Sequence, residues 1–138
     1  MSHPAHPALV HFPIACWILS TVGDIASMWL GESMWKLSGT MLAIGTMTAV
    51  VAMISGLLEL KKINSTDKAS RTAEIHMQLI LVAWTLYAIS LFIRLKGLQL
   101  AAPGLAELLL SGVGMAVLVT AGWYGGKLVY QHGIGVQK

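Results

Sequence analysis

Five histidines and one glutamate lie near the ends of the apolar runs of this chain, and their side chains can do chemistry. They are His3, His6, His11, His76, His132 and Glu59. Imidazole nitrogens and carboxylate oxygens bind transition-metal ions, and two imidazoles can hold the iron of a haem. An up-and-down path through four membrane spans returns all of these residues to one membrane face. We therefore expect a metal or haem site at that face.

The composition indicates an integral membrane protein. Of the 138 residues, 56% are hydrophobic and only 11% are charged, whereas a soluble domain usually has about 25% charged residues. The formal net charge of +3 comes from basic residues beside apolar runs, which favours a role in membrane orientation and argues against binding to nucleic acid. The lone cysteine, Cys16, excludes an intrachain disulfide.

Four apolar runs are long enough to cross the hydrocarbon core as helices, which takes about 20 residues. They cover roughly residues 9–30, 37–60, 73–95 and 105–130, joined by short polar or glycine- and proline-containing segments. The sequence predicts an all-α fold, an integral membrane four-helix up-and-down bundle that forms a single domain over residues 1–138. No convincing internal repeat is visible, and the first run has no obvious cleavage site for a signal peptide.

The basic residues predict how the bundle is oriented in the membrane. Six of the nine lysines and arginines lie on the side that holds the termini: Lys61, Lys62, Lys68, Arg71, Lys127 and Lys138. The opposite side carries Lys36, Arg94 and Lys96. The positive-inside rule then places both termini and the histidine face in the cytoplasm.

His11 and His76 are the preferred pair of ligands. His76 lies inside an apolar segment, and a polar ring within a span usually faces the bundle interior. Pro7 and Pro13 bracket His11 and restrict the backbone around it. His76 could instead be bonded to a backbone carbonyl near the membrane interface.

The other ligand candidates lie closer to the interface. His132 is the second choice as a ligand, and His6 could be a second ligand or a partner of the first. His132 and His6 could instead be surface residues, and we expect His3 to be a terminal residue without a role in the site. Glu59 could accept a ring N–H from a ligating histidine, could ligate a metal directly, or could pair with a nearby basic residue, namely Lys61, Lys62 or Arg71.

Small and acidic residues add two further expectations. Gly45, Ala52 and Glu59 belong to a narrow stripe of small or polar residues on the second run, which indicates close helix packing or room for a flat cofactor. Asp24 lies toward the opposite face, where an acid within a span needs a partner. Arg94 or Lys36 could supply it, and we favour a structural ion pair over a proton pathway.

Two end motifs resemble a known family. HPALVHFPIA at residues 6–15 and GWYGGKLVYQHGIGV at residues 122–136 look like the paired signatures of the small four-helix membrane proteins grouped as domain of unknown function 2231. The segment RTAEIHMQL, Asp24 and Glu59 also match that family. The resemblance implies a multi-pass bundle in a bacterial cytoplasmic (inner) membrane. Because this domain is also found joined to Rieske or cytochrome c modules, it implies electron transfer by association.

Three functions follow from these residues. The first is a b-type haem protein with one haem, held by two of His11, His76, His132 and His6, which transfers electrons to or from quinone or a redox partner protein. The second is a non-haem metal site formed by His11, His76, His132 and Glu59. The third is a cofactor-free assembly subunit. In each case the protein contacts the lipid bilayer and could form a homo-oligomer. A binding or electron-transfer protein is favoured over a stand-alone enzyme.

Overall fold

The structure is a computed structural model that describes residues 6–60 and 67–136. Within these residues the chain forms four long helices, α1 (His6–Leu30), α2 (Glu32–Leu60), α3 (Asp67–Arg94) and α4 (Leu105–Tyr130). Each is long and apolar enough to cross a membrane, which confirms the predicted all-α four-helix membrane fold. The expectations for His3, Lys61, Lys62 and Lys138 lie outside the described residues.

Three helices begin earlier than the sequence predicted. The predicted starts at residues 9, 37 and 73 were the first continuous apolar residues, but α1 begins at His6, α2 at Glu32 and α3 at Asp67. The polar flanks continue the helix because helical hydrogen bonds do not require apolar side chains. Gly31, with a φ of 75°, supplies the left-handed residue that allows α1 to end and α2 to begin one residue later.

A small hairpin was missed in the segment before α4. Strands β1 (Leu95–Lys96) and β2 (Gln99–Leu100) pair antiparallel, and Gly97 between them has a φ of 64°. The sequence predicted only a loop here, because strands of two residues are too short to show an alternating pattern.

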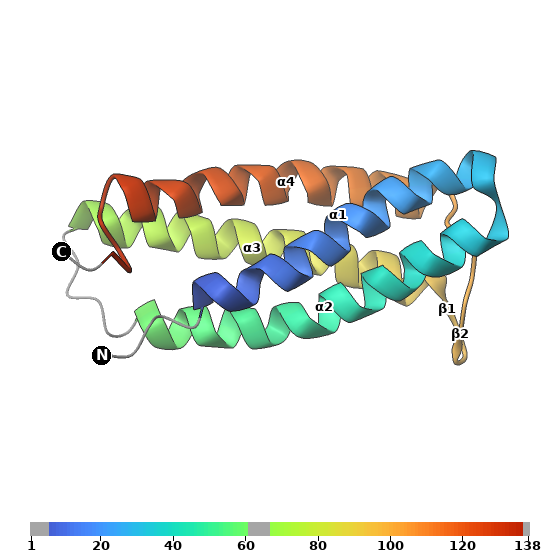
Figure 1. Cartoon of the computed structure of the whole chain (residues 1–138), viewed down its shortest axis with the longest axis horizontal. Coiled ribbons are helices and arrows are strands. Elements are labelled where there is room, and N and C mark those ends of the chain that lie inside the picture. The colour runs from blue at the N-terminus through green and yellow to red at the C-terminus, as the bar shows by residue number, and fades with distance from the viewer. Residues whose placement is uncertain (1–5, 61–66, 137–138) are drawn as a thin grey trace.

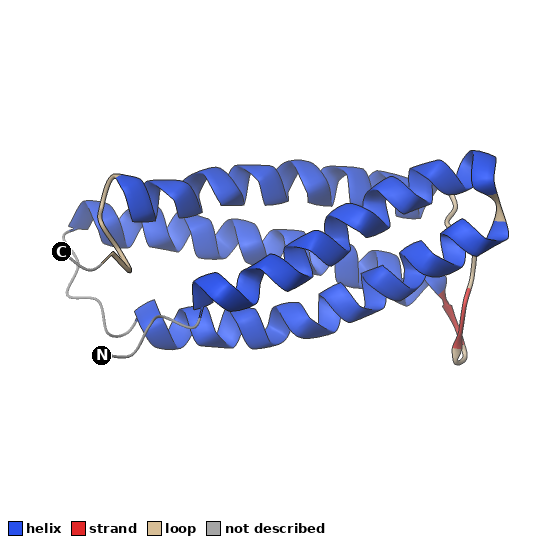
Figure 2. Cartoon of the chain, viewed as in Figure 1, coloured by secondary structure: helices blue, strands red, loops and turns tan. Residues whose placement is uncertain are grey.

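The four helices pair as two helical hairpins. α1 packs along α2 and α3 packs along α4, with closer contact inside each pair than between them. Figures 1 and 2 show that α1 and α3 run in the same direction. We call the end where α1 and α3 begin the histidine end. The opposite end, which holds Gly31 and the β1–β2 hairpin, is the ion-pair end.

Equivalent contacts relate the two hairpins by an approximate twofold axis along the bundle. Trp17 of α1 stacks on Tyr87 of α3 with ring centroids 4.8 Å apart. Each ring also lies against a glycine of its own hairpin: a Cβ added at Gly45 would approach Trp17 to 3.0 Å, and one at Gly114 would approach Tyr87 to 3.1 Å. An internal repeat is therefore present in the contacts, although the sequence did not reveal it.

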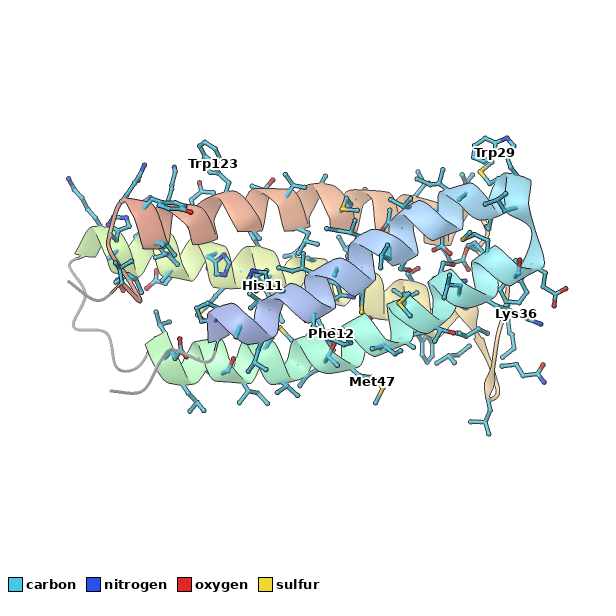
Figure 3. The ribbon with its side chains drawn as sticks, in the orientation of Figure 1. His11, Phe12, Trp29, Lys36, Met47 and Trp123 are labelled. Atoms are coloured by element: carbon cyan, nitrogen blue, oxygen red, sulfur yellow. The ribbon has the colours of Figure 1, made fainter. Side chains whose placement is uncertain are left out.

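The outer surface of the bundle is apolar. Large exposed side chains cover all four helices, and Figure 3 shows Trp29, Met47 and Trp123 projecting away from the bundle. Trp123 is 69% exposed and Met47 is 72% exposed. In a membrane-spanning bundle such residues contact lipid, which accounts for a composition too apolar for a single small core.

Candidate functional site

His76 is held in place by α4. Its ring Nδ1 donates a hydrogen bond of 2.8 Å to the backbone carbonyl of Ala121. The ring packs on Gly125, where an added Cβ would lie 3.2 Å from the ring Cε1. Because a carbonyl can only accept, the proton resides on Nδ1, and Nε2 keeps its lone pair in the neutral ring. His76 therefore has the tautomer of a metal or haem ligand.

His6 is held by α2 in the same way. Its ring Nδ1 lies 2.9 Å from the carbonyl oxygen of Ala52 and 3.3 Å from Ser55 Oγ. The ring packs on Gly56, where an added Cβ would lie 2.7 Å from the ring Cε1. The backbone N–H of His6 donates to Glu59 Oε1 at 3.0 Å. Glu59 thus satisfies the first N–H of α1 and fixes the position from which the ring extends.

His6 and His76 occupy equivalent positions in the two hairpins. His76 follows His6 by 70 residues, the same separation as between Trp17 and Tyr87. In each hairpin the carbonyl acceptor precedes the glycine by four residues, or one helical turn. The histidine end therefore presents two matching imidazoles, one from each hairpin.

His11 lies elsewhere. Its side chain is exposed, and the equivalent position in α3 is Leu81, which is 56% exposed. Figure 3 draws His11 on the edge of α1 that faces α3 in this view. The pairing of His11 with His76 stays a prediction, but the geometry favours His6 as the partner. The signal in the sequence was a shared spacing, since His6 precedes Asp24 and His76 precedes Arg94 by 18 residues each.

The predicted four-residue metal set is not gathered into one place. His132 Nε2 lies 3.2 Å from Thr72 Oγ1, and Glu59 accepts the backbone N–H of His6. Among residues 6–60 and 67–136, no group of three or more His, Cys, Asp or Glu side chains is arranged to hold a metal ion. His132 and Glu59 therefore have hydrogen-bonding roles in the described structure.

The ion-pair end holds a buried Asp24–Arg94 pair. Arg94 Nη1 donates to both carboxylate oxygens of Asp24, at 2.8 and 2.9 Å, and both side chains are fully buried. Two backbone carbonyls, those of Trp35 and Ala101, accept the remaining Arg94 bonds at 3.0 and 3.2 Å. Ser38 also donates to Asp24. The expected ion pair between Asp24 and Arg94 is therefore confirmed, and its hydrogen bonds offset the cost of removing both charges from water.

Comparison with known proteins decides the family. A family model described as "predicted membrane protein (DUF2231)" matches residues 2–138. The chain belongs to this family. The match confirms the family resemblance that the two end motifs indicated, and the matched region covers nearly all of the chain. Comparisons with curated proteins and with solved structures gave no significant match.

Proposed function

We propose that this membrane protein binds one b-type haem between its two hairpins at the histidine end, with Nε2 of His6 and Nε2 of His76 as the axial ligands. One observation carries the proposal. Each hairpin supplies one imidazole whose Nδ1–H is bonded to a backbone carbonyl and whose ring rests on a glycine. This arrangement leaves both Nε2 lone pairs free to bind iron.

The donor set and its symmetry suit haem. A haem iron takes up to two protein ligands, one on each face of the macrocycle, and these two positions are equivalent. Two imidazoles related by an approximate twofold axis match that requirement. A bare zinc-type ion commonly takes three or four protein ligands, so the His6–His76 pair fits a haem better than a free ion.

The protein residues have defined tasks in this proposal. The carbonyls of Ala52 and Ala121 set the orientation and the tautomer of the two rings. Glu59 holds the backbone of His6. A haem held by His6 and His76 would supply one-electron transfer, because the two histidines would leave no ligand position open for a substrate. The proposed partner is therefore a quinone or a redox protein that reaches the histidine end.

The proposed location follows from the basic residues. Lys68 and Arg71 lie in the first turns of α3 and Lys127 in the last turn of α4, all at the histidine end. We propose that this end faces the cytoplasm of a bacterial inner membrane. Electrons would then exchange at the cytoplasmic side, since the proposed site lies at that end alone.

A reduced-minus-oxidised visible spectrum of the purified protein tests the proposal. The protein is made with ample haem and purified in detergent. We expect a Soret band with α and β bands on reduction, and one haem per chain by pyridine haemochrome assay. His6→Ala and His76→Ala should each lose most of the haem while the protein still inserts.

Matched controls come from the remaining histidines. His11→Ala and His132→Ala should keep the spectrum of the unchanged protein. Loss of haem in His11→Ala with retention in His6→Ala would restore the pair predicted from the sequence. A wild-type spectrum without haem bands would refute haem binding, and elemental analysis would then distinguish a non-haem metal protein from a cofactor-free subunit.

A further inference from the structure

Three serine hydroxyls are buried deep in the bundle. Ser20 of α1 and Ser90 of α3 are 0% exposed, and Ser111 of α4 is 1% exposed. Within the part of the chain that the structure describes, none of these three hydroxyls has a hydrogen-bond partner. A buried hydroxyl without a partner destabilises a fold, and three in one protein need an explanation.

Two of the serines lie at the same level between α1 and α3. Ser20 follows Trp17 by three residues and precedes Asp24 by four. Ser90 has the same spacing from Tyr87 and Arg94. Trp17 stacks on Tyr87, and Asp24 bonds to Arg94. These two direct contacts between α1 and α3 therefore bracket the serines, one helical turn on either side.

The third serine comes from α4 at a matching height. Ser111 precedes Gly114 by three residues, and Gly114 packs against the ring of Tyr87. The equivalent position in α2 is Leu42, which is 0% exposed. Three helices thus contribute a hydroxyl to this layer, and the fourth contributes an apolar side chain. We call Ser20, Ser90 and Ser111 the serine layer.

The serine layer differs from most of the described threonine hydroxyls of the bundle. Thr21, Thr48, Thr72, Thr85 and Thr120 each donate to the carbonyl four residues earlier in their own helix. Such local bonds satisfy a hydroxyl inside a helix without outside help. None of the three serines makes one. Their hydroxyls are therefore available to form hydrogen bonds with a small polar molecule between the helices.

We propose that the serine layer is a water-binding site, in which ordered water bridges Ser20, Ser90 and Ser111. A buried water typically makes two to four hydrogen bonds to polar groups that lack other partners, and three hydroxyls supply that number. The fourth helix has the fully buried Leu42 at the equivalent position, so it adds no hydroxyl to this site. The site lies one turn from the Asp24–Arg94 pair, so the bound water adds polarity beside the buried charges. This inference is independent of haem binding.

A crystal structure at a resolution that shows ordered water tests the proposal on the unchanged protein. We expect a water peak within hydrogen-bonding distance of at least two of the three hydroxyls. Serine hydroxyls bonded only to carbonyls of their own helices, with no water peak between them, would overturn the proposal.

The sign of a stability change provides a second test. Ser20→Ala, Ser90→Ala and Ser111→Ala should each lower the thermal midpoint, because the bound water loses a partner. Thr85→Ala, which removes an exposed hydroxyl bonded within its own helix, is the matched control and should leave the midpoint unchanged. In a dry layer the same serine substitutions would raise the midpoint, since each removes an unsatisfied buried hydroxyl, and that result would overturn the proposal.

Discussion

The two ends of the bundle use the same approximate symmetry in opposite ways. At the histidine end the two hairpins carry identical residues at equivalent positions: a histidine, the alanine that accepts its bond and the glycine beneath its ring. At the ion-pair end they carry complementary residues, Asp24 and Arg94. Identical residues suit a shared ligand with two equal faces, whereas a direct contact between charged groups requires opposite signs.

Breaking the buried ion pair should have the largest effect. Arg94→Leu removes the partner of Asp24 and two carbonyl contacts. We expect a loss of about 3–5 kcal/mol in the free energy of unfolding, because a buried charge is left unpaired. The measurement is unfolding in mixed detergent and denaturant, followed by circular dichroism.

Lys36→Leu is the control at the same end of the bundle. Lys36 forms an exposed ion pair with Glu32, and exposed pairs contribute little to stability because water screens both charges. Equal stability of the Arg94 and Lys36 variants would contradict the role assigned to the buried pair.

Filling the glycines at the histidine end should have an intermediate effect. A Cβ at Gly56 would lie 2.7 Å from the His6 ring, and one at Gly125 would lie 3.2 Å from the His76 ring. Gly56→Ala and Gly125→Ala should displace the rings from their carbonyls and weaken haem binding by about 10-fold or more. Haem titration monitored at the Soret band measures this loss.

Gly122→Ala gives the comparison for these variants. An added Cβ at Gly122 meets nothing within 4 Å, so haem affinity should not change. If all three alanine variants bind haem equally well, the glycines do not position the ligands.

Tyr87→Phe should have the smallest effect. It removes the 2.9 Å hydrogen bond between the Tyr87 and Thr21 hydroxyls and keeps the ring stacked on Trp17. We expect a loss of about 0.6 kcal/mol, the average for interhelical hydrogen bonds in a membrane protein. A loss as large as that of Arg94→Leu in the same unfolding assay would show that the two halves meet mainly through this hydroxyl.

The sequence predicts the fold better than it predicts the site. Long apolar runs identify membrane helices because lipid offers no hydrogen bonds to backbone N–H and C=O groups. A charge inside a span needs a partner, and this argument predicted that Asp24 would pair with Arg94 or Lys36. His6 was harder to rank. Its ring meets Ala52 and Gly56 from the first turn of α1, and a position three residues outside the apolar run has no hydropathy signal.

The repeat was hidden for a different reason. At the centre of the bundle the equivalent residues are of different types, such as Trp17 with Tyr87 and Leu42 with Ser111. Such pairs share a place in the packing but little chemistry. In the sequence they are related only by their equal distances from His6 and His76. The contacts in the structure are needed to show that these distances reflect equivalent positions.

The approximate twofold axis also has a consequence for how such a chain can arise. A helical hairpin crosses the bilayer twice and returns to its starting side, so a second copy fused behind it inserts in the same orientation. In a dimer of one ancestral hairpin, the residue at the position of Asp24 and Arg94 would meet its own copy, and two like charges would repel. Fusion into one gene frees the two positions to mutate separately, and an acid can then face a base.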